Sequence, residues 1–158
     1  MTLREVRKTV AGYRQPRLSS ELDAARQLLE AAGIEYSIEP PHRDLPQSLD
    51  AVLAWTVREG ITNVIRHSRA QHCQVWFTLD QAWVGVEMLN DREGTEDAPE
   101  LCLGQGSGLL GLQERVSGLG GMMEAGPLLL SGKPHFRLRV ELPIQPRVEV
   151  TALQEERS

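Results

Sequence analysis

The sequence predicts an α+β domain in which helices pack on one face of an antiparallel or mixed sheet. The expected order of elements is a strand, a long helix, two strands, a glycine-containing loop, a short helix and two strands. Consecutive strands joined by short turns favour antiparallel pairing, because a parallel pair needs a long crossover connection. The 158 residues are enough for one compact domain plus an extra element, and not for two full domains.

The composition is that of an ordinary globular protein, with 41% hydrophobic and 25% charged residues. A formal net charge of −5 gives no basic surface for nucleic acid. No apolar run approaches the roughly 20 residues that span a bilayer, and no signal peptide is recognisable, so we expect a chain of cytosolic character. Cys73 and Cys102 lack metal-ligand spacing, and each is more simply a small buried hydrophobe.

Two helical segments open the chain, over residues 2–12 and 17–32. We expect Ser19 or Ser20 to cap the second helix and Gly33 to end it. The apolar side of this second helix is predicted to consist of Leu22, Ala25, Leu28 and Leu29.

A strand and a long helix follow. Residues 34–39 alternate between apolar and polar side chains, and a proline-rich connection then leads to a helix over residues 48–68. The apolar face of this helix is predicted from side chains that recur at spacings of three and four residues, namely Leu53, Val57, Ile61, Val64 and Ile65.

The other side of the long helix is polar. Glu59, Asn63 and His67 fall together at roughly 100° per residue, with Arg66 beside them. The ordinary interpretation is a solvated face, but such faces usually consist of Lys and Glu at salt-bridge spacing. Here a carboxylate and an amide supply oxygen ligands for a hard cation, and a guanidinium and an imidazole supply donors for phosphate.

Two more strands are expected at residues 74–79 and 82–89, joined by a tight turn at Asp80 and Gln81. Residues 90–106 then form a long acidic loop, which is either a disordered connector or a lid over a ligand. The last strands are expected at residues 122–125 and 136–142, before a polar tail.

Glycines gather where the acidic loop meets the short helix. Glycines let the backbone approach an anion, and the start of a helix directs free N–H groups and its positive dipole end at it. Gly106, Gly108 and Gly111 also satisfy G-x-G-x-x-G, but they follow the acidic loop and not a strand. That context excludes the dinucleotide-binding interpretation of the motif.

These motifs resemble those of sensor histidine kinases of the NarX/DesK-like branch. Residues 58–68, REGITNVIRHS, resemble the family's N box, REALTNVVRHS, without a gap, and residues 106–116, GSGLLGLQERV, resemble its G2 box, GxGLxGMRERV. The resemblance covers nearly all of residues 2–143. It implies the two-layer α/β sandwich of the GHKL (Bergerat-fold) superfamily, which histidine kinases share with gyrase B, Hsp90 and MutL.

The resemblance also implies a domain organisation. Residues 1–33 resemble the end of the dimerisation and phosphotransfer domain and its linker, a helical remnant that precedes the sandwich. Residues 34–145 correspond to the ATP-binding catalytic domain, with its ATP lid at about residues 90–106, and residues 146–158 form a polar tail.

The function implied is transfer of the γ-phosphoryl group of ATP to a histidine, for relay to a response regulator. Asn63 would hold Mg²⁺ and Glu59 would orient or deprotonate the attacking histidine. The nucleotide-binding residues implied are Asn63, Arg66, His67, Asn90, Asp91, Gly94, Gly106, Ser107, Gly108, Leu109 and Gly111.

The chain departs from the family pattern at the G1 box, usually Asp-x-Gly-x-Gly, whose first Asp accepts a hydrogen bond from the adenine amino group. Residues 90–94 read NDREG, so that Arg92 replaces the first glycine. Either Asn90, through its amide carbonyl, or Asp91, after a one-residue shift, would take the place of the adenine reader. Alternatives are therefore a catalytically weak nucleotide-binding or docking module of the same fold, or a GHKL ATPase or anti-sigma serine kinase.

A phosphoacceptor histidine is not recognisable. None of the four histidines, which are His42, His67, His72 and His135, precedes the segment that resembles the second dimerisation helix, and none is followed by Asp or Glu. We therefore expect the acceptor helix outside this sequence, in the same kinase. The family resemblance implies a homodimer with a membrane sensor region and with this domain on the cytoplasmic side.

Overall fold

The structure is a computed structural model of the chain, and it describes residues 15–92 and 107–144. Three predictions lie outside the described residues: the helix over residues 2–12, the loop from residue 93 to 106 with Gly94 and Gly106, and the tail beyond residue 144. Cys102 lies outside them as well.

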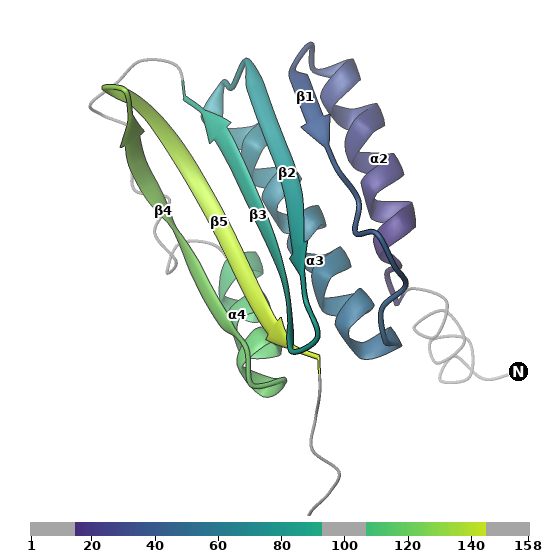
Figure 1. Cartoon of the computed structure of the whole chain (residues 1–158). Coiled ribbons are helices and arrows are strands. Elements are labelled where there is room, and N and C mark those ends of the chain that lie inside the picture. The colour runs from purple at the N-terminus through teal and green to yellow at the C-terminus, as the bar shows by residue number, and fades with distance from the viewer. Residues whose placement is uncertain (1–14, 93–106, 145–158) are drawn as a thin grey trace, which may run out of the picture.

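The sheet has five strands in the order β1-β2-β3-β5-β4 (Figure 1). β1 pairs with β2 in parallel, and the other neighbours pair antiparallel. The strands are β1 (Glu35–Ile38), β2 (His72–Leu79), β3 (Trp83–Asp91), β4 (Met122–Leu130) and β5 (Lys133–Pro143). This confirms the predicted mixed, mostly antiparallel sheet.

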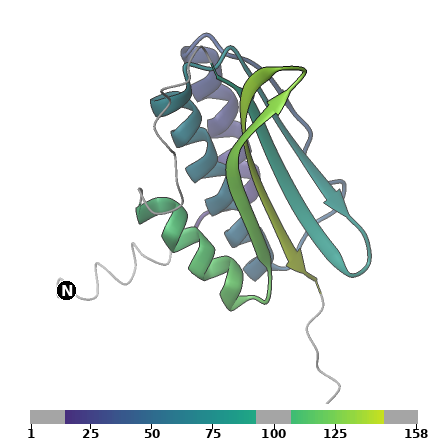
Figure 2. The same ribbon diagram turned by 90° about the vertical axis from the view of Figure 1, so that its left-hand side faces the viewer.

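Within the described residues, three α-helices form a second layer on one face of the sheet (Figure 2). They are α2 (Leu18–Ala31), α3 (Gln47–Asn63) and α4 (Ser107–Gly118), and a π-helical turn, η1 (Val64–Ser68), continues α3. The two-layer fold predicted from the sequence is confirmed.

The core lies between the two layers. α3 buries Leu53, Val57 and Ile61 against the sheet, as their spacing predicts. Gly60 brings α3 close to β3, because a Cβ at this position would overlap the thioether of Met88. This close approach fixes the C-terminal turns of α3 over the sheet.

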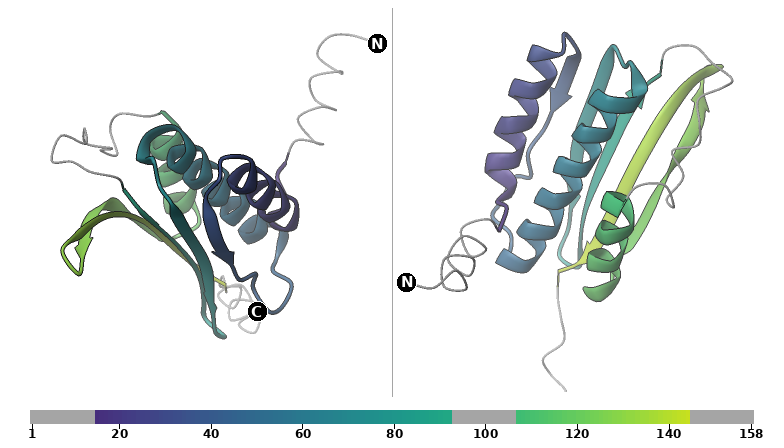
Figure 3. Two further views of the ribbon diagram at one scale, coloured as in Figure 1. Left: turned by 90° about the horizontal axis from the view of Figure 1, so that it is seen from above. Right: turned by 180° about the vertical axis from the view of Figure 1, so that it is seen from behind.

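α2 packs beside α3 (Figure 3), and its two ends differ in how they match the prediction. Gly33, with φ of 73°, ends the helix as expected, and the N–H of Ile34 donates to the Leu29 carbonyl. Ser19 and Ser20 were expected as caps, which is wrong, because both lie inside the first turn. The N–H of Leu18 donates instead to the carboxylate of Asp50 on α3, at 3.0 Å.

The apolar side of α2 also differs from the prediction. Leu28 is 50% exposed, whereas Leu18 is buried in its place beside Leu22, Ala25 and Leu29. The helix begins one residue later than expected and packs on α3 through a narrower stripe, which leaves Leu28 at the edge.

The prediction of one regular helix over residues 48–68 is wrong at its C-terminal end. Residues 64–68 form a π-turn, whose i→i+5 hydrogen bonds make it wider than an α-helical turn. The wider turn shifts the phase of the side chains, so that Val64 stays buried but Ile65, predicted on the apolar face, is 38% exposed.

Several strands are longer than their sequence pattern indicates. β3 extends through Asn90 and Asp91, which were expected in the loop, because these residues pair with Cys73 on β2 and His135 on β5. β4 and β5 also extend to a two-residue turn at residues 131–132, where positive φ angles of 52° and 76° match a hairpin turn of type I′.

We predict that Leu53→Ala lowers the free energy of unfolding by about 2–5 kcal/mol, because it leaves a cavity where α3 meets the sheet. Leu28→Ala is the matched control, since the same truncation at an exposed site on α2 should change stability by less than about 0.5 kcal/mol. Urea unfolding of both variants measures the difference. Equal losses would contradict the packing described here.

Candidate functional site

Segments far apart in the sequence meet at one end of the molecule. The C-terminal end of α3 with η1 and the end of β3 lie at the same end (Figures 1 and 3). α3 also contacts α4, and η1 contacts β3. The fold therefore gathers the polar helix face, the strand end and the glycine-containing helix start.

Glu59 lies against the first turn of α4. A Cβ at Gly108 would collide with the Glu59 carboxylate, whose Cδ would lie 2.7 Å from it, so any larger residue there would force this carboxylate to move. The N–H groups of residues 107–109 precede the first i→i−4 hydrogen bond of α4, and they are available to an anion. Gly111 lies in the next turn, and the Leu109 side chain is buried in the core, so Leu109 offers only its backbone.

Asn63 sits one turn beyond Glu59, at the end of α3. Its Nδ2 atom is buried and has no hydrogen-bond partner among the described residues. A buried amide nitrogen without a hydrogen-bond partner costs free energy. A bound ligand that accepts from it would supply the missing hydrogen bond. The nitrogen of the Asn63 amide is therefore available to a ligand within the described part of the chain.

Arg66 and His67 lie exposed on η1, which presents them to solvent beside the end of α3. Ser68 closes the π-turn: its hydroxyl donates to the Val64 carbonyl at 2.6 Å and accepts from the N–H of Ala70 at 3.1 Å. Single-turn π-helices occur frequently at functional sites. Neither Arg66 nor His67 makes an ion pair in the described part of the chain.

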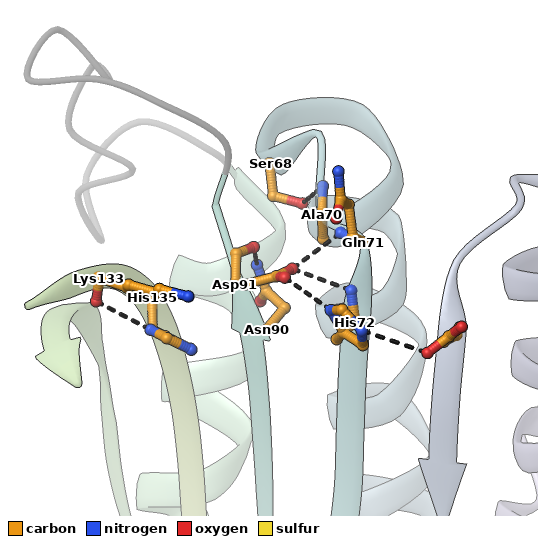
Figure 4. Close-up of polar contacts among 9 residues, drawn as sticks. Ser68, Ala70, Gln71, His72, Asn90, Asp91, Lys133 and His135 are labelled. Carbon is orange, nitrogen blue, oxygen red and sulfur yellow. Dashed lines mark hydrogen bonds and ion pairs between the residues drawn. The ribbon is translucent and has the colours of Figure 1, made fainter. Parts of the chain in front are cut away.

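Asn90 and Asp91 face opposite sides of the sheet, because side chains alternate along β3. Asn90 is 4% exposed and lies on the helix side with Met88, and its Nδ2 donates to the Asp91 carbonyl at 2.9 Å. The Asp91 side chain lies on the outer face, where it accepts hydrogen bonds from the N–H groups of Gln71 and His72 and pairs with the His72 ring (Figure 4).

These contacts shift the pKa values of Asp91 and His72. Burial is the largest single effect on Asp91 and raises its pKa, but hydrogen bonds from His72 and Gln71 together outweigh it, and the pKa is lowered. The hydrogen bond to Asp91 raises the pKa of His72, and its Nε2 also reaches the Glu35 carboxylate at 3.2 Å. His72 thus links β1 to β3 across β2.

Cys73 lies next to this cluster but faces the helices. Burial, followed by the nearby Asp91 carboxylate, raises the pKa of its thiol to about 12. A buried thiol with so high a pKa is a poor nucleophile, and Cys73 is the small buried hydrophobe that the sequence predicts.

Within residues 15–92 and 107–144, no three His, Cys, Asp or Glu side chains come together as a metal-binding group. Among the helices of these same ranges, none is long and apolar enough to cross a membrane.

Of the predicted site residues, the structure brings Glu59 and Gly108 into direct contact, and Asn63 follows Glu59 one turn later on α3. Sequence reasoning missed the contacts of Gln71 and His72 with Asp91. No sequence signal could have revealed them, since the residues are 19 or 20 positions apart and meet only through the register of β2 and β3.

Curated relatives of the chain are sensor histidine kinases of Bacillus subtilis (strain 168). Sensor histidine kinase DesK is 34% identical over 119 residues, which cover 73% of this chain and 31% of DesK. Sensor histidine kinase YxjM is 26% identical over 149 residues, which cover 90% of this chain and 35% of YxjM. The chain thus spans about a third of the length of these relatives. No protein-family model matches the sequence.

Solved structures of similar fold are also histidine kinases. The histidine kinase domain of the Erythrobacter litoralis EL346 blue-light activated histidine kinase matches 82% of this chain and 65% of its own, with a TM-score of 0.64 at 17% identity. The catalytic domain of histidine kinase ThkA matches 83% of this chain and 96% of its own, with a TM-score of 0.56 at 14% identity. At these identities the likeness concerns the fold alone.

We predict that Gly108→Ala is less stable than Gly111→Ala by about 1 kcal/mol, because the new methyl group at residue 108 overlaps the Glu59 carboxylate and forces it to move. Gly111→Ala is the control: a Cβ there meets nothing within 4 Å, and alanine favours a helix over glycine by about 1 kcal/mol. Urea unfolding compares them. In a Glu59→Ala background this difference should vanish, and an undiminished difference would refute the contact.

Proposed function

Because the chain is homologous to sensor histidine kinases and has the fold of their ATP-binding domain, we propose that it is the catalytic domain of a two-component sensor histidine kinase. It would transfer the γ-phosphoryl group of ATP to a histidine outside this sequence, for relay to a response regulator. The observation that carries the proposal is the unpartnered amide nitrogen of Asn63, one turn from Glu59, whose carboxylate borders the start of α4.

The phosphates of ATP would meet donors from two elements. The backbone N–H groups at the start of α4, with Gly106, Ser107, Gly108, Leu109 and Gly111 shaping the turn, would surround the anion. Arg66 and His67 on η1 would approach the anion from the side of α3. No acidic side chain of the described residues pairs with either of them. Most of phosphoryl-transfer catalysis is positioning and charge neutralisation, which these groups supply.

Mg²⁺ fits this arrangement through Asn63. An amide oxygen is a hard ligand, and the Asn63 amide makes no hydrogen bond to another described residue. Mg²⁺ usually takes one or two protein ligands together with phosphate oxygens and water, so a dedicated cluster of carboxylates is not required. When bound, it neutralises charge on the phosphates. The chain's own part is to hold the amide at the end of α3.

The adenine reader would be Asn90, and not Asp91. Asn90 lies on the helix side of β3, the same side as Glu59 and Asn63, whereas Asp91 lies on the outer face and is engaged with His72. Gly94 would belong to the same subsite, and it lies outside the described residues. An amide carbonyl can accept from the amino group of adenine as a carboxylate does.

Glu59 would act on the incoming histidine. Its carboxylate borders the start of α4 and can hydrogen-bond a nucleophile that approaches the γ-phosphate from that side. As a base it would orient the imidazole or take its proton while the imidazole nitrogen bonds to phosphorus and the bond to ADP breaks.

The larger protein implied is a homodimer with a membrane sensor region, with this domain on the cytoplasmic side. Residues 1–33 would be the end of its dimerisation domain, residues 34–145 the catalytic domain and residues 146–158 a polar tail. α2, within the proposed linker segment, packs into the same hydrophobic core as α3.

Radiolabelled ATP and a separately supplied phosphoacceptor domain of a sensor histidine kinase test this proposal. Acid-labile label on histidine supports it. Label on serine would favour an anti-sigma-type serine kinase, release of inorganic phosphate a GHKL ATPase, and nucleotide binding without either a docking module.

We predict that Asn63→Ala abolishes the Mg²⁺-dependent part of ATP binding and leaves the fold intact, because it removes the free amide. Calorimetric titration with Mg²⁺ and with EDTA should then give the same weak affinity. Gln74→Ala is the control, since it removes an amide from the exposed face of β2. A variant that still gains affinity from Mg²⁺ would remove Asn63 from the site.

We also predict that Glu59→Gln keeps ATP affinity within a few-fold, since losing one charge near a triphosphate relieves repulsion. In a longer chain that includes the phosphoacceptor helix, the change should slow phosphohistidine formation roughly 100-fold or more, the usual size of a general-base contribution. Glu114→Gln on the exposed face of α4 is the control. An unchanged rate would leave Glu59 with a structural part only.

A further inference from the structure

We infer that Asp91 is a positioning residue that fixes the amide orientation of Asn90 and so selects a 6-amino purine over a 6-oxo purine. The inference rests on the proposed function, because it concerns how the same site would tell adenine from guanine. In this role Asp91 binds neither a metal ion nor the base, and acts only through Asn90.

The need for such a residue follows from the chemistry of asparagine. A carboxylate in this position could only accept, and it would always prefer the amino group of adenine. An amide carries both a donor and an acceptor, and a half-turn of its side chain exchanges them. If Nδ2 faced the base, Asn90 would donate to the 6-oxo group of guanine. Asparagine therefore discriminates only if its orientation is held.

The main chain of Asp91 holds it. The Nδ2 group of Asn90 donates to the Asp91 carbonyl at 2.9 Å. The reversed amide would set its oxygen against that carbonyl oxygen, and two acceptors repel at hydrogen-bond distance. Among the described residues no donor reaches Oδ1 of Asn90, which is left to accept from a ligand. Because Asn90 is buried, water competes poorly for either group.

The Asp91 carbonyl can do this only if the strand end is rigid, and the Asp91 side chain makes it so. One carboxylate oxygen accepts from the N–H groups of Gln71 and His72, at 2.8 and 2.9 Å, and the other pairs with His72 Nδ1 at 2.9 Å (Figure 4). On the far side of β3, the N–H of Arg92 donates to the Pro134 carbonyl at 3.1 Å. The last residues of β3 are thus tied to both neighbouring strands.

These ties have a consequence for the altered sequence at residues 90–94. Asn90 and Asp91 work as a pair, the first contacting the base and the second setting which atom of the first is presented. A carboxylate is retained next to Asn90, but its negative charge is directed to the outer face and away from the ligand.

Calorimetric binding of Mg-ATP and Mg-GTP to the full chain tests the inference. Wild type should bind ATP at least about tenfold more tightly than GTP. Asp91→Ala should reduce that ratio about fivefold or more, the equivalent of one misplaced hydrogen bond. Glu124→Ala, which removes a carboxylate from the same outer face, should leave the ratio unchanged.

The decisive comparison uses Asn90→Asp. A carboxylate has no donor to rotate toward guanine, so Asp91→Ala should not change the ATP-to-GTP ratio in that background. A ratio that falls equally in both backgrounds, or that Asp91→Ala leaves intact in the wild-type background, would overturn the inference. If wild type bound neither nucleotide, the proposed function itself would fail. If it bound both equally, only this inference would.

A second measurement is made on the wild-type protein, and a variant serves only to assign the signal. Hydrogen exchange of the Asn90 side-chain amide, assigned in nuclear magnetic resonance spectra by its absence in Asn90→Asp, should be slowed in the nucleotide-free protein. Exchange at the rate of an exposed amide would contradict the fixed orientation.

Discussion

The close packing of α3 on the sheet is the constraint on which the rest of the site depends. Gly60 lets the helix backbone approach the Met88 side chain, and the apolar face beneath it is fully buried. Glu59, and Asn63 one turn later, therefore lie on a helix whose backbone is held in place by packing. Because a helix repeats every 3.6 residues, burying one face determines where the other face points. The burial of the apolar face of α3 thus sets the positions of Glu59 and Asn63, and the helix keeps its regular backbone hydrogen bonds there.

The π-turn at residues 64–68 resolves a conflict between core and surface. A regular helix would carry Ile65 toward the core and would keep Arg66 and His67 in phase with Asn63. The wider turn places Ile65 at the surface while Val64 stays buried. The hydroxyl of Ser68 donates a hydrogen bond to the Val64 carbonyl. An exposed Ile65 is the cost of this arrangement. Exposed apolar residues and irregular turns of this kind occur at functional sites, which agrees with the phosphate contacts proposed for Arg66 and His67.

Periodicity in the sequence predicted the fold class, the elements and the face of α3 that carries Glu59 and Asn63, since each depends on residues near one another in the chain. It failed where a contact across the fold decided the local structure. The cap of α2 comes from Asp50 on a neighbouring helix, which local capping rules cannot find. The extension of β3 to Asp91 depends on pairing with both neighbouring strands, and the phase shift at Ile65 depends on how tightly the core can close. The short helix after the glycines, α4, was also predictable from the local sequence, whereas phosphate binding at its first turn stays a prediction.

Alternation along a strand explains how a sequence that departs from the usual G1 box would still provide the proposed adenine site. Consecutive residues face opposite sides of the sheet, so an ungapped reading and a reading shifted by one residue make opposite physical claims. With Asn90 inside and Asp91 outside, only one of the two can meet a ligand between the layers. The outer residue is then free to stabilise the strand end, and its hydrogen bonds to β2 are formed before any ligand arrives. A binding group held in place beforehand loses less conformational entropy on binding. In the proposed site, the rigidity that Asp91 gives Asn90 would in this way offset the weaker acceptor strength of an amide.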